Sequence, residues 1–235
     1  MKLILFPLLL LACSAGLPLG QPEKKVFFMF FVKGQGAPPT DPKEAEAVAK
    51  THFSNMGAQV ERARLVAAGP LKDPTEVRRG ITVLTLSSRG ELADTFKGDE
   101  FVKRDIMRVE AAEWKVDAKR FNPKVDASTI VEHRLVLLKD GPGKSPVNEE
   151  MRKAHRAYLD SLEQTHGLAV WGEVLPSDDK SFQGLRSAMI FTSTDTSAIE
   201  RALAADLFVQ RGLLTVEVIP LWMSKGVVRG RSSLP

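Results

Sequence analysis

The stretch DEFVKRDIMRVE at residues 99–110 recurs without gaps as DLFVQRGLLTVE at residues 206–217. Six of the twelve aligned positions are identical, among them the first Asp and the last Glu. A solenoid repeat has a period of only about 20–50 residues, whereas a separation of this size matches a whole small domain. The sequence therefore predicts a fused pair of similar domains.

Further repeated residues lie upstream of these two stretches. His52 and Gly69 are 17 residues apart, and so are His155 and Gly172. The offset between the halves is 103 residues for these pairs and 107 for the Asp-x-Phe stretch. The difference falls within residues 70–80, where we expect a loop. Each predicted domain thus carries the same His and the same Asp.

Both halves give the same order of predicted elements: strand, helix, strand, strand, helix, strand. In the first half these elements are predicted at residues 26–33, 42–62, 65–68, 81–86, 91–97 and 107–114. In the second half they are predicted at residues 134–139, 148–164, 168–171, 187–192, 197–205 and 215–222. This βαββαβ order is typical of the ferredoxin-like unit.

The first strand, at residues 26–33, is apolar at nearly every position, which indicates burial on both faces. The natural cover for its second face is the sheet of the other repeat. We therefore expect an α+β protein in which two ferredoxin-like domains pack sheet to sheet as a pseudo-dimeric α+β barrel. The expected domains span residues 25–115 and 132–224, joined by a charged linker at 116–131 and followed by a disordered Gly/Arg/Ser tail at 225–235.

Residues 1–20 have the pattern of a secretory signal peptide. Lys2 gives a minimal positive region, and Leu3–Leu11 form an apolar run too short to span a bilayer. No later stretch is apolar enough for a membrane span. We expect export to a bacterial periplasm, to the cell envelope as a lipoprotein, or to the medium.

Cys13 is the single cysteine and follows Leu10-Leu11-Ala12, which resembles a bacterial lipobox. In that interpretation Cys13 is lipidated and anchors the mature protein. The alternative is an ordinary signal peptide cleaved after Ala15, Gly16 or Gly20, with the cysteine discarded. Either way no cysteine remains for an internal disulfide, so stability must come from the core and from domain pairing.

Several repeated residues together resemble a known family. The pattern is a His on the long helix, a Gly about 17 residues later, an Asp-x-Phe-Val motif and a last strand that ends in Trp. These residues are His52, Gly69, Asp99 and Trp114 in the first copy and His155, Gly172, Asp206 and Trp222 in the second. The chain resembles the YCII-related family of the dimeric α+β barrel superfamily, in two tandem copies that cover nearly all of the mature chain.

The resemblance implies a pair of acid–base residues in each copy: His52 with Asp99, and His155 with Asp206. The family's usual Pro after the Asp is Glu100 in one copy and Leu207 in the other. Family members are usually single domains that dimerise, so this chain resembles a fused dimer. Its domains would pair within one chain, although further self-association remains open.

The implied activity is cofactor-free acid–base chemistry of the isomerase or lyase type on a small organic acid or lactone. A His titrates near neutral pH, and a neighbouring carboxylate orients its ring and stabilises its cation. The alternative is a non-catalytic small-ligand-binding or structural domain of the cell envelope. In that case each His–Asp pair is a hydrogen-bonded part of the core.

Arg104 and Arg211 recur after the Asp motif and are candidates for binding a substrate carboxylate bidentately. The alternative is an ordinary surface ion pair for each. Glu110 and Glu217 recur on the last strand, where we expect them to face solvent or to pair with Arg.

Other functions are not supported by the composition or by motifs. The net charge of +4 is too small to indicate a nucleic-acid partner. The sequence GPGKS at residues 141–145 lacks the first Gly of a P-loop, because Leu138 stands at that position. The four His have no spacing typical of a metal site. We expect neither a metal nor another cofactor, and a small molecule as the partner.

Overall fold

The computed structural model describes residues 23–230 of the 235-residue chain. The expected signal peptide at 1–20, with Cys13, lies outside the described residues. In the described part, no helix is both long and apolar enough to cross a membrane.

The predicted element order is confirmed in both halves. The first half contains β1 (Lys25–Lys33), α1 (Pro42–Glu61), β2 (Leu65–Pro70), β3 (Arg78–Leu86), α2 (Glu91–Phe96), α3 (Glu100–Lys103) and β4 (Met107–Lys115). The second half contains β5 (Ile130–Asp140), α4 (Glu149–Thr165), β6 (Leu168–Val174), β7 (Leu185–Phe191), α5 (Thr196–Ala204), α6 (Leu207–Gln210) and β8 (Leu214–Ser224). The one-turn helices α3 and α6 were not predicted.

The two long helices begin where local hydrogen bonding fixes their first turn. The side chain of Asp41 accepts a hydrogen bond from the backbone N of Glu44 at 3.0 Å, with Pro42 at the start of α1. Asn148 accepts one from the backbone N of Met151 at 2.9 Å at the start of α4. Such caps satisfy donors that the helix itself leaves unpaired. They place the His-bearing turns of α1 and α4 at fixed positions over the sheet.

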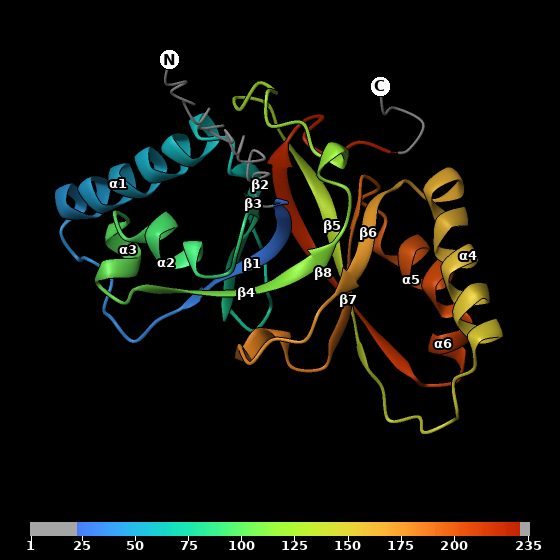
Figure 1. Ribbon diagram of the computed structural model, residues 1–235. Helices are drawn as coiled ribbons and strands as arrows, with labels where there is room; N and C mark the ends of the chain where they lie inside the picture. Colours follow the sequence, from blue (N-terminus) through green and yellow to red (C-terminus); the bar gives the residue numbers. More distant parts are fainter. Residues whose placement is uncertain (1–22, 231–235) are drawn as a thin grey trace, which may run out of the picture.

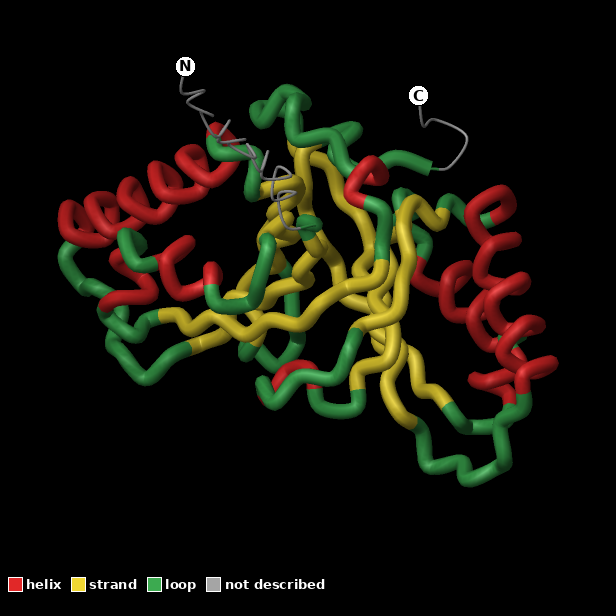
Figure 2. Tube along the Cα trace, in the orientation of Figure 1, coloured by secondary structure: helices red, strands yellow, loops and turns green. Residues whose placement is uncertain are grey.

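The strands form one antiparallel sheet in the order β2-β3-β1-β4-β6-β7-β5-β8. The halves join where Trp114 of β4 pairs with Val174 of β6. At the other end, a single bridge between Leu71 and Leu221 brings the segment after β2 onto β8 and so closes the barrel. Helices α1–α3 flank one side of the barrel and α4–α6 flank the other (Figures 1 and 2).

The strands are buried on both faces, as the apolar first strand predicted. Phe28 and Phe30 of β1 belong to the barrel interior, which also contains Leu135 and Leu137 of β5. The alternate side chains of β1, such as Phe31, pack instead against the helices of their own half. Because both halves fill one interior, neither half has a complete core by itself.

The expectation of a disordered tail is wrong for its first residues. Val227 and Val228 are only 5% and 7% exposed and pack on the barrel interior. Val228 forms a bridge with Phe121 of the linker, which is itself buried. The open end of the barrel presents apolar side chains that need cover, and the linker and the tail together supply it.

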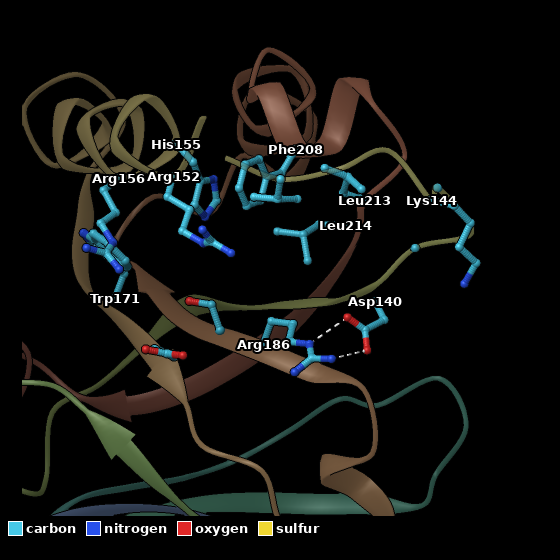
Figure 3. A pocket seen from close by; sticks show the side chains of 15 residues that line it. Asp140, Lys144, Arg152, His155, Arg156, Trp171, Arg186, Phe208, Leu213 and Leu214 are labelled. Atoms are coloured by element: carbon cyan, nitrogen blue, oxygen red, sulfur yellow. Dashed lines mark hydrogen bonds and ion pairs between the residues drawn. The ribbon is translucent and has the colours of Figure 1, made fainter. Parts of the chain in front are cut away.

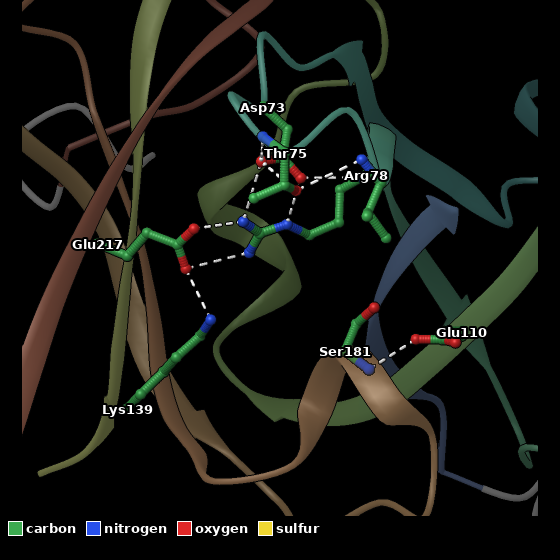
Figure 4. A network of polar contacts seen from close by, with 8 residues as sticks. Asp73, Thr75, Arg78, Glu110, Lys139, Ser181 and Glu217 are labelled. Carbon is green, nitrogen blue, oxygen red and sulfur yellow. Dashed lines mark hydrogen bonds and ion pairs between the residues drawn. The ribbon is translucent and has the colours of Figure 1, made fainter. Parts of the chain in front are cut away.

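A polar network links the halves at the recurrent glutamates. Arg78, in β3, donates to both Asp73 and Glu217, and Lys139 lies 2.7 Å from Glu217 (Figure 4). Conversely, Glu110 of the first half accepts a hydrogen bond from the backbone N of Ser181 in the second half at 2.7 Å. Each recurrent Glu thus contacts the other half. Glu217 binds Arg78 in β3, and Glu110 binds Ser181 in the loop between β6 and β7.

The same contacts explain two shifted pKa values. Burial opposes ionisation of Asp73, but hydrogen bonds from Arg78 and Thr75 outweigh it and lower the pKa of this carboxyl. Burial likewise acts to raise the pKa of Glu217, and hydrogen bonds from Arg78 and Lys139 lower it overall. Both carboxylates are therefore held in their charged form at the seam between the halves.

Candidate functional site

The structure brings each predicted His–Asp pair together. Nδ1 of His52, on α1, lies 2.6 Å from Oδ2 of Asp99. Nδ1 of His155, on α4, lies 2.8 Å from Oδ2 of Asp206. The long helix supplies the His in both halves, and the residue before the one-turn helix supplies the Asp.

Each Asp also caps the short helix that it precedes. Oδ1 of Asp99 accepts from the backbone N of Phe101 at 3.0 Å, and Oδ1 of Asp206 accepts from that of Phe208 at 2.9 Å. Both Asp residues are 0% exposed. One carboxylate oxygen thus maintains the local fold, while the other orients the His ring.

The two His rings lie in different aromatic surroundings. The ring of His52 meets Phe31 and Phe101 edge-on, with centroids 5.2 and 5.4 Å away. The ring of His155 lies parallel to that of Phe208, with centroids 4.4 Å apart. Their side chains remain 14% and 13% exposed, respectively. Among the described residues, all hydrogen bonds of both rings use Nδ1, which leaves Nε2 as the nitrogen available to a ligand.

His155 lines a cavity of about 670 Å³ between the helices and the sheet of the second half (Figure 3). We call it the C-terminal cavity. Four cationic side chains line it, against two carboxylates. The cations are Lys144, Arg152, Arg156 and Arg186, and the carboxylates are Asp140 and Glu173. The excess of positive charge favours an anionic ligand.

The cations differ in how far they are already neutralised. Arg186 is bound by Asp140 through two hydrogen bonds of 2.7 and 2.8 Å. Arg152 has only a distant partner, Glu149 at 3.8 Å. Within residues 23–230, neither Lys144 nor Arg156 forms an ion pair. These three cations are therefore the ones able to bind an incoming anion.

The loop that carries Lys144 is held close to the backbone of the Asp motif. A Cβ atom added at Gly141 would lie 2.1 Å from the carbonyl oxygen of Gly212. The equivalent Gly34 has the same close approach, 1.8 Å from the carbonyl oxygen of Asp105. Only glycine permits this packing, and both halves have it at the same place in the loop. The loop of the second half differs in that it also carries a lysine, Lys144.

His52 lines a second cavity, of about 470 Å³, in the first half. We call it the N-terminal cavity. Its lining is mostly apolar and aromatic, and among the described residues Arg79 is the one with a permanent charge there. The side chains of Phe31, Met56, Phe101 and Met107 are among its walls. The repeated His–Asp pair therefore borders two cavities of different chemistry.

Arg104 and Arg211, the residues predicted to bind a substrate carboxylate, do not line either cavity. Arg104 forms ion pairs with Glu44 and Glu100, and Arg211 contacts the sulfur of Met151 at 3.1 Å. Each Arg follows a one-turn helix whose Phe, Phe101 or Phe208, lines a cavity, but neither Arg does so itself.

Arg79 and Arg186 instead line the N-terminal and the C-terminal cavity, respectively. They are related by the offset of 107 residues that also relates the Asp motifs, and they lie at equivalent places in β3 and β7. Sequence reasoning missed this pair, although the common offset was a usable signal. Within the described part of the chain, no group of three or more potential metal ligands occurs.

Comparison with protein families finds a YCII-related domain at residues 134–222. This domain spans β5 to β8 and contains His155 and Asp206. No curated protein matches the chain.

Solved structures resemble the whole barrel. A chlorite dismutase mutant from Candidatus Nitrospira defluvii, in complex with cyanide, superposes with a TM-score of 0.57 at 10% identity, covering 86% of this chain and 92% of that one. A heme-binding protein from Thermus thermophilus superposes with a TM-score of 0.55 at 9% identity, covering 86% and 91%. The chain therefore has the dimeric α+β barrel fold of chlorite dismutase-like proteins, with a YCII-related domain as its second half.

Proposed function

We propose that the second half is an acid–base site for a small organic anion, with His155 as the proton-transferring group. The observation that carries this proposal is the His155–Asp206 pair at the edge of a cavity rich in cations. The reaction type is isomerisation or elimination on an organic acid or a lactone. We further propose that the first half is a second, diverged YCII-like copy, because it repeats the element order and the His–Asp pair.

In this proposal each group has a role. Asp206 accepts a hydrogen bond from Nδ1–H of His155, so the neutral ring presents the lone pair of Nε2 as the base. Arg152 and Arg156 lie on the same face of α4 as His155 and hold the carboxylate of the substrate. Nε2 then removes a proton from the carbon next to the carbonyl group. The electron pair left behind forms a double bond, and either the proton returns at another carbon or a leaving group departs.

Heme is bound by one structural neighbour, so the fit of heme to this chain needs a test on the residues themselves. A porphyrin needs flat apolar walls on both faces beside its axial ligand. The C-terminal cavity instead has six ionic side chains in its lining, and Phe208 covers one face of the His155 ring. The N-terminal cavity is apolar, but its volume of about 470 Å³ is small for a porphyrin with its propionates. These residues do not fit heme, and we derive no step through it.

A non-catalytic ligand-binding or structural role is the second candidate. The observation that favours it is the helix cap that each Asp provides, because a capping carboxylate stabilises the fold whether or not the site is catalytic. In that case the cations of the C-terminal cavity would bind an anion that is not converted.

Solvent-proton exchange separates the two candidates. The protein is incubated in deuterated water with a panel of small carboxylic acids and lactones, and ¹H NMR follows the loss of signals from carbon-bound protons. We expect exchange or conversion of at least one compound, with a loss of at least about 100-fold in His155→Gln. His166→Gln is the matched control, because His166 does not line the cavity and its Nδ1 forms a hydrogen bond with Thr165. Exchange that persists in His155→Gln contradicts the acid–base role.

Export remains part of the proposal, with Cys13 as the site of lipidation or the cysteine lost with a cleaved signal peptide. It is supported by the apolar run Leu3–Leu11 after Lys2. Mass spectrometry of the mature N-terminus distinguishes a lipidated Cys13 from a start after Ala15, Gly16 or Gly20. An intact Met1 in the mature protein contradicts both forms.

A further inference from the structure

The N-terminal cavity contains a buried hydroxyl for which the protein supplies no partner. Thr82, in β3, is 0% exposed and lines this cavity. Its Oγ1 has no hydrogen-bond partner among the described residues. Ile81 and Val83 point into the barrel interior, so the side chain between them faces the helices and the cavity. A hydroxyl buried in this way costs free energy unless something bonds to it.

The equivalent position in the second half has no such hydroxyl. Thr82 pairs with Met29, and the equivalent Met189 pairs with Val136 in the same register. Met189 is fully buried in an apolar cluster. The hydroxyl is therefore not required by the barrel fold, and its place in the first half needs another reason.

A second difference leaves room beside Thr82. Trp171 lines the C-terminal cavity, whereas Ala68 stands at the equivalent place in the N-terminal cavity. The smaller side chain leaves space for a ring of another molecule against Phe31 and Phe101. Phe53 also lines this cavity and is 71% exposed, which is unusual for a large apolar side chain.

We propose that the N-terminal cavity binds a small aromatic molecule with one hydroxyl or carbonyl oxygen. The ring packs among the aromatic and Met side chains, and the oxygen forms a hydrogen bond with Thr82 Oγ1. Pockets of about 300–1,000 Å³ with apolar walls and a few polar groups are typical of such ligands, and this cavity of about 470 Å³ lies within that range. The inference is independent of the acid–base proposal, which concerns the other cavity.

Binding of 1-naphthol tests the inference, with naphthalene as the ligand that lacks the oxygen. Isothermal titration of the mature protein should give a dissociation constant below millimolar for 1-naphthol. Thr82→Val removes the hydroxyl at nearly constant volume, and we expect about tenfold weaker binding of 1-naphthol with naphthalene unchanged. Thr85→Val is the matched control on the same strand, because Thr85 bonds to the carbonyl oxygen of Ala63 and does not line the cavity.

A measurement on the wild-type protein guards against variants that fold poorly. The methyl signals of Met56 and Met107 should shift on addition of 1-naphthol, while that of Met189 stays in place. The inference is overturned if the wild-type protein does not bind 1-naphthol, if Thr82→Val binds it as tightly as the wild type, or if the Met56 and Met107 signals do not move. Malonate, a small dicarboxylate, serves as the probe of the cationic C-terminal cavity. Its binding should not respond to Thr82→Val, so failure of one proposal is distinguishable from failure of the other.

Discussion

The two cavities share a set of three side chains, which we call the frame, and differ in the residues that form their walls. Each has a His on the long helix that is bound to a buried Asp, and an Arg from the third strand of its half. The C-terminal cavity adds Lys144 and two arginines from α4, whereas the N-terminal cavity is lined mainly by aromatic and aliphatic side chains. The frame is thus compatible with ligands of quite different charge.

The frame persists because it also serves the fold. Asp99 and Asp206 each cap a one-turn helix with one oxygen and orient a His with the other. Replacing either Asp would damage local structure and the site together. Wall positions such as Ala68 and Trp171, which are equivalent in the two halves, differ instead in size and chemistry.

The largest expected effect comes from the interior that both halves share. Phe28→Ala removes a fully buried ring from the barrel and should cost about 3–5 kcal/mol of unfolding free energy. Leu203→Ala, in the helix-side cluster of the second half, is the comparison and should cost about 2–5 kcal/mol. In urea unfolding followed by circular dichroism and by Trp fluorescence, both variants should lose the two halves in one transition. Two separate transitions would show that the halves have independent cores.

A smaller effect is expected at the polar seam. Glu217→Gln leaves the buried Arg78 with one carboxylate and should cost about 1.5–3 kcal/mol at pH 7. Glu110→Gln should cost less, because Glu110 accepts from a backbone N–H of Ser181 and its amide oxygen can still do so. The pKa values of Asp73 and Glu217 are lowered in the folded protein. The stability that their charged forms give to the fold is therefore fully present above pH of about 4.5 and is lost progressively as the pH falls below that value.

Urea midpoints at pH 7 and pH 3 check this pair of variants. The difference in stability between wild type and Glu217→Gln should shrink at pH 3, whereas Glu110→Gln should stay close to wild type at both. An equal loss in the two variants at pH 7 would contradict the unequal roles of the two glutamates.

The smallest effect concerns His133 in β5. This residue is 3% exposed, and burial lowers its pKa below the ordinary value of 6.5. The unfolded chain therefore binds a proton that the folded one does not, and stability should fall as the pH drops through about 6.5. His133→Gln should remove this slope in urea midpoints measured between pH 8 and pH 5. An unchanged slope would assign the pH dependence to other groups.

Much of the fold was readable from local signals. The sequence Asp41-Pro42 marked the start of α1, and the recurrent Asp motif marked two equal halves. The tail was misjudged because its Val227 and Val228 are buried only by the open end of a barrel formed from distant strands. Packing of this kind leaves no periodic pattern in a short segment.

The candidate site was only partly predictable. The His–Asp pairs were found because each member recurs at a matching place in the two halves. The same logic selected Arg104 and Arg211, which follow the one-turn helices and do not line either cavity. The cations of α4 could not be found by repetition, since only the second half has them in its cavity lining.

The central claim is that the two cavities bind ligands of different chemistry. Its most direct test is a pair of NMR titrations of the wild-type protein, followed at the ring signals of His52 and His155. Malonate is added in one titration and 1-naphthol in the other, with assignments from His52→Gln and His155→Gln. The account predicts that malonate shifts the signals of His155 alone and that 1-naphthol shifts those of His52 alone. Equal responses of both rings to both ligands, or a response of neither ring, would contradict two cavities with one frame and separate ligands.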